Sequence, residues 1–218
     1  MAAQTVVLYF HGFASSPGSA KVVELRRLLG PDAIDLIAPD LNIPSFERLS
    51  FAAMAAAMAD LASGLRPRAL VGSSLGALLA LEVGRRGAVA PQVLIAPALG
   101  VADRWMGLIP DGDPILVPHY RSGLKEPIHR RFFEEIAAIR CDEEPPSVPV
   151  TIIMGTDDQS VPFDRVAGRW RAWVESGRLV EGSRLITVKG GDHSLLDHVG
   201  TIADAIRAAV RESLAANV

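Results

Sequence analysis

The sequence predicts an α/β protein with an open, doubly wound and mainly parallel sheet. Short apolar or β-branched runs alternate along the chain with stretches of helical pattern, and short links between them imply right-handed crossovers. Several of the apolar runs are uninterrupted, as in Val-Val-Leu-Tyr-Phe over residues 6–10. Such runs are typical of parallel strands that are covered on both faces. We therefore expect one domain that spans residues 1–218.

The strands and helices follow one another in a regular order. The expected strands are Thr5–Phe10, Ala33–Ala38, Ala69–Gly72, Gln92–Ala96, Val148–Met154 and Arg184–Val188. Ser or Pro in residues 15–19 should start the first helix, and the third helix follows as an Ala/Leu-rich run. Trp170 and Trp173, three residues apart on the fourth helix, should face the core. The expected helices lie near Ser19–Leu29, Ser45–Leu65, Leu75–Arg86, Phe163–Glu175 and Asp197–Ala215.

Residues 99–144 break the alternation. This segment has no convincing strand but contains four prolines and several aromatic residues. Since a long insertion in a compact α/β domain is usually functional, we expect it to fold over the carboxyl edge of the sheet as a lid. The alternative is a solvated helical excursion. Its four cations between residues 119 and 131 could meet an anionic substrate, or could form a solvated helix face; they are Arg121, Lys125, Arg130 and Arg131.

The composition excludes several classes of protein. The net charge of −3 gives no sign of nucleic-acid binding. Cys141 is the only cysteine, which rules out an intrachain disulfide and a multi-cysteine metal site, and we expect neither a metal nor a cofactor.

The apolar stretch 51–59 is too short to span a membrane. No secretory signal is visible, so the expected location is the cytoplasm. The oligomeric state is not predicted.

The pentapeptide Gly72-Ser73-Ser74-Leu75-Gly76 lies between a short apolar run and the Ala/Leu-rich helix. This is the strand–turn–helix context in which G-x-S-x-G forms a nucleophile elbow. There the central serine is raised above the strand ends, and the flanking glycines avoid a clash of Cβ atoms. A plain Gly/Ser loop is the alternative.

The loops that follow other strands supply partners for Ser74. Asp157 and Asp158 follow the strand 148–154, and His193 follows the strand 184–188. Functional groups of open α/β sheets collect at the carboxyl ends of strands. The order Ser, Asp, His is the one expected of a serine hydrolase on such a sheet.

The chain resembles the α/β-hydrolases, and in particular the small bacterial YqiA-like esterases. The resemblance rests on Tyr9-Phe10-His11-Gly12-Phe13, Ser15-Ser16-Pro17, Ser19-Ala20-Lys21 and Val71-Gly72-Ser73-Ser74-Leu75-Gly76. It covers nearly the whole chain in strand order and is weakest in residues 99–144. The family usually begins with an antiparallel hairpin, whereas this chain starts almost directly on the His-Gly strand. The resemblance therefore implies a shortened sheet of six strands.

The resemblance and the chemistry assign the same roles. Ser74 would be the nucleophile and His193 its general base, although His193 could instead be a surface loop residue. The family pattern Gly-x-x-Asp-x-x-Val-Pro selects Asp158 over Asp157, which would be a turn or capping residue. Asp158 would hold the tautomer of His193 and stabilise its imidazolium form. Asp192 is too close in sequence to His193 for that hydrogen bond.

Backbone amides complete the expected site. The amides of Phe13 and Leu75 would form the oxyanion hole, and His11 would order the loop that contains Phe13. Apolar side chains of the insertion suggest an acyl pocket, with Trp105, Met106, Phe132 and Phe133 as candidate substrate-binding residues.

These features predict a serine hydrolase without a cofactor, and most specifically a carboxylesterase that cleaves small to medium acyl esters through an acyl-serine intermediate. An acyl thioesterase or a C–C hydrolase could use the same triad. A ligand-binding protein on a hydrolase scaffold is the alternative from another class, because a fold alone does not determine function.

Overall fold

The computed structural model describes residues 5–100, 107, 109–119 and 122–216. Six strands form one sheet, in the order β2-β1-β3-β4-β7-β8, and every adjacent pair is parallel. The strands are β1 (Thr5–Phe10), β2 (Ile34–Ile37), β3 (Ala69–Ser73), β4 (Gln92–Ile95), β7 (Val150–Gly155) and β8 (Arg184–Val188). The prediction of an α/β fold with a six-stranded parallel sheet is therefore confirmed.

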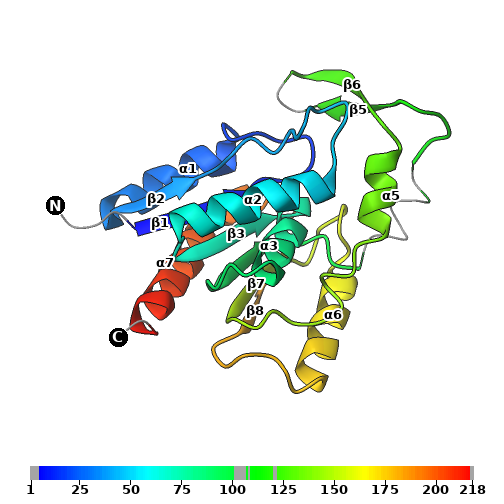
Figure 1. The fold of residues 1–218 in the computed structure, drawn as a ribbon. Helices are drawn as coiled ribbons and strands as arrows, with labels where there is room; N and C mark the ends of the chain where they lie inside the picture. Colours follow the sequence, from blue (N-terminus) through cyan, green and yellow to red (C-terminus); the bar gives the residue numbers. More distant parts are fainter. Residues whose placement is uncertain (1–4, 101–106, 108, 120–121, 217–218) are drawn as a thin grey trace.

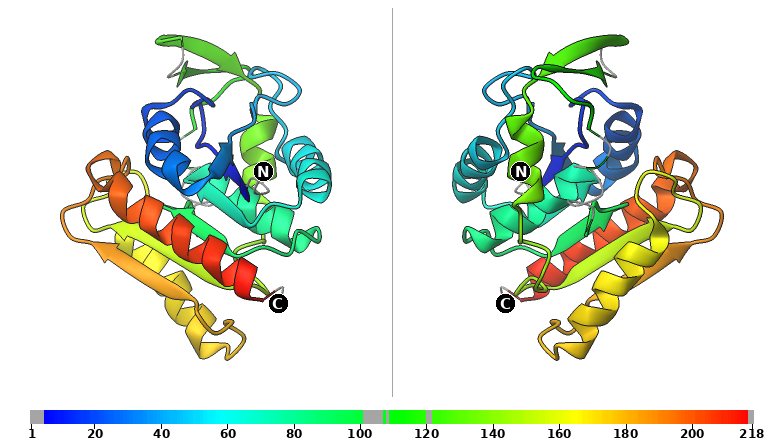
Figure 2. Two further views of the ribbon diagram at one scale, coloured as in Figure 1. Left: turned by 90° about the vertical axis from the view of Figure 1, so that its left-hand side faces the viewer. Right: turned by 90° about the vertical axis from the view of Figure 1, so that its right-hand side faces the viewer.

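Helices cover both faces of this sheet (Figures 1 and 2). One face carries α1 (Ala20–Leu29) and α7 (Val199–Ala215), which contact each other. The opposite face carries α2 (Phe51–Leu65), α3 (Leu75–Arg85) and α6 (Phe163–Glu175). Short 3-10 turns lie at Gly30–Asp32 and Leu196–His198. Because β3, β4 and β7 are buried along their whole length, their largely apolar sequences match their environment.

Helix α2 begins later than the sequence predicts. The expected helix started at Ser45, but the structure starts α2 at Phe51. Ser50 is in an extended conformation, and its hydroxyl accepts a hydrogen bond from the amide of Ala53 at 3.2 Å. Ser50 is thus the N-cap, and a capping serine marks the point where the helical hydrogen bonds begin.

The insertion contains strands that the sequence did not predict. β5 (Ile115–His119) and β6 (Leu124–Ile128) form an antiparallel hairpin, followed by α5 (Arg131–Ala137). The expectation of a segment without strands, and of a helix face between residues 119 and 131, is therefore wrong. Pro118 and Pro127 both lie in this two-stranded ladder. Proline is tolerated there because each strand of a lone hairpin has an outer edge that needs no amide donor.

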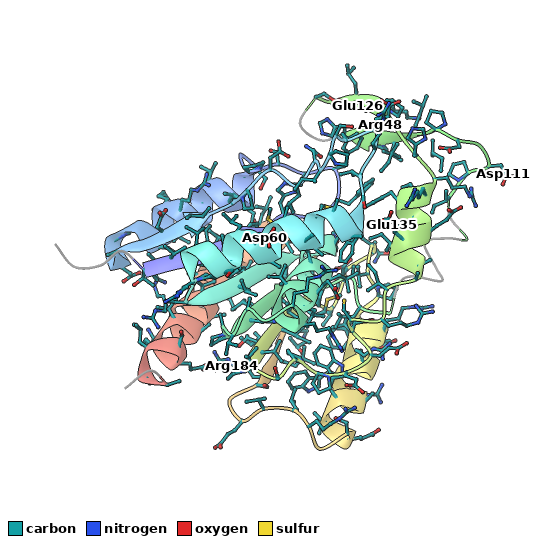
Figure 3. All side chains as sticks on the ribbon, in the orientation of Figure 1. Arg48, Asp60, Asp111, Glu126, Glu135 and Arg184 are labelled. Atoms are coloured by element: carbon teal, nitrogen blue, oxygen red, sulfur yellow. The ribbon has the colours of Figure 1, made fainter. Side chains whose placement is uncertain are left out.

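The insertion is attached to the start of α2. The Glu135 carboxylate on α5 accepts a hydrogen bond from the Ser50 hydroxyl at 3.0 Å, and Glu135 lies beside the N-terminal end of α2 in Figure 3. The amide of His129 also donates to the carbonyl of Glu47 at 2.9 Å. The hairpin and α5 consequently extend from the end of the molecule near the start of α2 (Figure 1). Within the described residues, no helix is long and apolar enough to cross a membrane.

Candidate active site

The turn between β3 and α3 has the geometry of a nucleophile elbow. Ser74 has φ 55° and ψ −116°, a strained conformation for a residue with a side chain. A Cβ atom on Gly72 would lie 2.2 Å from the carbonyl oxygen of Gly76, and one on Gly76 would lie 2.0 Å from that of Phe10. Both positions therefore require glycine, and the tight packing around them holds Ser74 in its strained conformation.

The loop after β1 lies against Ser74. A Cβ atom on Gly12 would lie 3.4 Å from the carbonyl oxygen of Ser73 and 3.5 Å from the Cβ atom of Ser74. This close approach packs the loop that contains Phe13 against the turn of Ser74. In the described part of the chain, neither the amide of Phe13 nor that of Leu75 donates a hydrogen bond. Both amides therefore lack an acceptor within the described residues, as the predicted oxyanion role requires.

The loops after β7 and β8 pack tightly against each other. A Cβ atom on Gly155 would lie 2.2 Å from the carbonyl oxygen of Gly191. The amide of Asp157 donates to that same carbonyl at 3.0 Å, and the amide of Gly190 donates to the hydroxyl of Thr156 at 2.8 Å. These contacts fix the loop of His193 relative to the loop of Asp158.

His193 connects Asp158 with Ser74. Its Nδ1 lies 2.7 Å from Oδ2 of Asp158, and its Nε2 lies 3.1 Å from Oγ of Ser74. A carboxylate only accepts hydrogen bonds, so Nδ1 carries the proton and Nε2 presents its lone pair to the serine hydroxyl. The other oxygen of Asp158 accepts from the amides of Ser160 and Val161, each at 2.8 Å. The buried carboxylate is thereby held in place for His193.

The other candidate acids have local partners. Asp157 is exposed and accepts a hydrogen bond from the hydroxyl of Thr156 at 2.8 Å. Asp192 accepts from the hydroxyl of Ser194 and from the amide of Leu195, both at 2.8 Å. These bonds, with that of the Ser194 hydroxyl first, lower the pKa of Asp192. Both aspartates thus organise their own turns.

His11 lies in the loop that follows β1. Its Nδ1 is 3.0 Å from the carbonyl oxygen of Gly12, and burial lowers the pKa of the ring. His11 is thus a buried neutral histidine whose hydrogen bond stays within its own loop.

The aromatic residues of α5 pack on the loop of Phe13. The Phe132 ring stacks on Phe13 with centroids 5.6 Å apart, and the Phe133 ring meets Phe13 edge-on at 5.8 Å. Phe132 is fully buried and Phe133 almost so. Their rings therefore belong to the core under the loop and do not line the cleft beside Ser74. Trp105 and Met106, the other candidate substrate-binding residues, lie outside the described residues.

A cleft of about 960 Å³ opens at Ser74 and His193. Its walls include Lys21, a residue to which the sequence analysis gave no role in the site. The ammonium group of Lys21 donates a hydrogen bond to Oγ of Ser73 at 3.0 Å. Lys21 is one of three lysines in the chain, and its position soon after the His-Gly loop was the available signal. In the parts of the chain that the structure covers, no cluster of three or more His, Cys, Asp or Glu side chains could hold a metal.

The sequence of the chain matches the model of one protein family. The sequence model of an uncharacterised protein family, UPF0227, matches residues 6–197. No curated protein matches the sequence.

Several solved structures have the same fold at low sequence identity. Est1E from Butyrivibrio proteoclasticus, solved with ferulic acid bound, has a TM-score of 0.78 at 14% identity, with 97% of this chain and 90% of that chain covered. The esterase domain of a Rhodothermus marinus protein has a TM-score of 0.72 at 19% identity, with coverage of 97% and 89%. Mouse alpha/beta hydrolase domain-containing protein 10 also has a TM-score of 0.72 at 19% identity, with coverage of 95% and 90%. The fold is thus that of the α/β-hydrolases.

Proposed function

Since the chain belongs to the uncharacterised protein family UPF0227 and has an α/β-hydrolase fold, we propose that it is a serine hydrolase, and specifically a carboxylesterase. The observation that supports this most strongly is the position of His193, which bridges the buried Asp158 carboxylate and the hydroxyl of Ser74. A binding protein would have no need of a strained serine that is hydrogen-bonded to a base.

Acylation would proceed by attack of Ser74 Oγ on the ester carbonyl carbon while Nε2 of His193 takes the hydroxyl proton. The amides of Phe13 and Leu75 would stabilise the resulting oxyanion, a contribution of typically about 10²–10³ in rate for each such donor. The C–O bond to the leaving group then breaks, and His193 gives its proton to the departing alcohol. Water repeats the sequence on the acyl-serine, releases the acid and restores Ser74.

The surroundings of the oxyanion amides favour a short acyl chain. A cavity of about 20 Å³ adjoins Phe13 and Leu75. Apolar side chains form most of its wall, among them Leu41, Leu49, Phe51, Met54 and Leu79. A space of this size holds about one small group. We therefore assign acetyl esters as the preferred substrates. The described residues of the insertion line neither this cavity nor the cleft at Ser74, so its proposed role as a lid rests on its place in the sequence between two strands.

A substrate panel tests the proposal. Purified protein would be offered p-nitrophenyl acetate, butyrate and octanoate, together with an acyl thioester and a β-diketone. Hydrolysis of the short esters that disappears in Ser74→Ala supports a carboxylesterase. Turnover of the thioester or the diketone alone would assign one of the other two reactions. Binding of esters by folded wild-type protein without any turnover would contradict an enzymatic role.

A further inference from the structure

Lys21 places a positive charge in the wall of the cleft. Its side chain is half-buried at the start of α1, and its ammonium donates to the hydroxyl of Ser73, the residue before Ser74. The phenol of Tyr9 shares a hydrogen bond with the same hydroxyl. Placing an ammonium in such a site costs free energy unless the charge acquires partners.

No carboxylate among the described residues forms an ion pair with Lys21. The two acids whose charges favour its ammonium form are Asp192 and Asp158. The oxygens of Asp158 are taken by His193 and two amides. Asp192 is exposed and bonded within its own turn, so water screens its charge. An ammonium has three donor hydrogens, and one of those of Lys21 is used by Ser73. The others are available to a ligand.

The cleft around Lys21 differs in chemistry from the apolar cavity at the oxyanion amides. Hydroxyl side chains contribute to its wall, namely Ser16, Ser19, Ser160 and Ser194. The same wall contains the ammonium of Lys21 and the carboxylate of Asp192. Hydroxyls and one ammonium suit an anion that accepts several hydrogen bonds, and the opposing charge of Asp192 is exposed to water, which screens it.

The position of the cleft indicates which part of the substrate it holds. His193 and Ser194 form one side of it, and Lys21 with the serines of the loop after β1 forms another. Because His193 gives its proton to the departing alcohol, the space beside its ring belongs to the leaving group. We propose that Lys21 anchors a subsite for a carboxylate carried by the leaving group of the ester. This inference rests on the proposed esterase function.

The charge of Lys21 gives the subsite a defined pH range. Burial lowers the pKa of Lys21 to about 8, against the opposing effects of Asp192 and Asp158. The ammonium form, and with it the preference for a carboxylate, should be present below pH 8 and be lost as the pH rises through that value. The groups that face Lys21 from neighbouring elements are Tyr9, Asp158, Asp192 and His193. Burial raises the pKa of Tyr9, so its phenol stays neutral over this range.

The test compares two esters that differ in charge. 4-Acetoxybenzoate and 4-acetoxybenzamide have leaving groups of similar shape, one anionic and one neutral. The measured quantity is the ratio of their kcat/KM values in wild type, in Lys21→Met and in Lys189→Met, a matched change at an exposed lysine. The two leaving groups differ in intrinsic reactivity, but this difference affects the ratio equally in all three proteins and so cancels when the ratios are compared. We expect the ratio to fall by about tenfold or more in Lys21→Met, as on loss of a charge-assisted hydrogen bond, and to be unchanged in Lys189→Met.

Each other outcome contradicts the inference in a distinct way. An unchanged ratio in Lys21→Met would mean that the cleft holds an uncharged leaving group, while the esterase proposal would stand. Equal losses on both esters would make Lys21 a support of the elbow and not a binding residue, and Lys21→Arg would not restore a charge preference. If the wild-type protein hydrolyses neither ester, the esterase proposal is overturned, and this inference with it.

Discussion

The rings of Phe13 and Phe132 are stacked, with centroids 5.6 Å apart and an interplanar angle of 18°. Phe13 contributes a proposed oxyanion amide, and Phe132 belongs to α5 in the insertion. The insertion is thus packed directly on the loop that would stabilise the transition state, and its stability and the catalytic rate should be linked.

Phe132→Leu tests that link. The substitution removes the stacked ring and leaves space beneath Phe13, so we expect a loss of about 1–3 kcal/mol in the free energy of unfolding. We also expect kcat for p-nitrophenyl acetate to fall, since the Phe13 amide loses its support, while KM changes less. Ile136→Val on the same helix is the control, because it creates a cavity without removing an aromatic contact to Phe13. Equal kcat values for the two variants would contradict the link.

Asp158→Asn should reduce kcat by roughly 10²–10⁴. An amide side chain can donate to Nδ1 of His193, which would place the imidazole proton on the wrong nitrogen for a base. The neighbouring Asp157→Asn changes an exposed turn residue whose carboxylate accepts from the hydroxyl of Thr156, and it should keep kcat within about threefold. Steady-state hydrolysis of p-nitrophenyl acetate measures both variants. A larger loss of kcat in Asp157→Asn than in Asp158→Asn would mean that Asp157, and not Asp158, is the acid that supports His193.

Gly76→Ala should destabilise the protein by about 3 kcal/mol or more or prevent folding, because the new Cβ atom would lie 2.0 Å from a backbone oxygen that cannot move freely. Gly168→Ala is the matched control on α6. No atom lies within 4 Å of its Cβ position, so the change should stabilise the helix by about 0.5–1 kcal/mol. Denaturant unfolding of both variants measures the difference, and similar unfolding midpoints would refute the packing argument for the elbow.

Cys141 should be inert in the native protein. Its side chain is buried, its thiol donates to the carbonyl of Leu78, and burial raises its pKa to about 12, with Asp142 and Glu82 acting in the same direction. The thiol is therefore protonated at neutral pH, whereas alkylation needs the thiolate. Iodoacetamide at pH 7.5 should label the protein only after unfolding. Rapid labelling of native protein would show that the site around Cys141 is open.

The sequence was sufficient for the sheet because its central strands β3, β4 and β7 are buried along their length, so their apolar runs stand out from the helices. Sequence position alone put Ser74, His193 and the pair Asp157 and Asp158 after strands whose carboxyl ends reach the same edge. The choice of Asp158 over Asp157 came from the family pattern, and in the structure it is the Asp158 carboxylate that lies 2.7 Å from His193. The hairpin β5–β6 was not predictable, because Pro118 and Pro127 normally argue against a strand and only a lone two-stranded ribbon accommodates them. The start of α2 was misplaced by several residues, as residues 45–50 have no strong helix breaker after Pro44.

Two features of the site depend on contacts between distant segments. The burial of Phe132 and Phe133 follows from their packing on Phe13, more than 100 residues away in sequence, and an aromatic pair in an insertion looks the same whether it faces a core or a cleft. Lys21 contacts Ser73 because α1 lies beside the end of β3. Its sequence neighbours place it at the start of a helix soon after the His-Gly loop, but they do not show that it reaches the residue before Ser74.

The most direct test of the central claim is covalent labelling of Ser74 by a fluorophosphonate, which reacts with serines that a neighbouring base activates. Intact-mass measurement of folded wild-type protein should show the addition of one probe molecule, peptide mapping should place it on Ser74, and Ser74→Ala and His193→Ala should remain unlabelled. Absence of labelling in folded wild-type protein, or labelling that persists in Ser74→Ala, would contradict the assignment of Ser74 as the nucleophile.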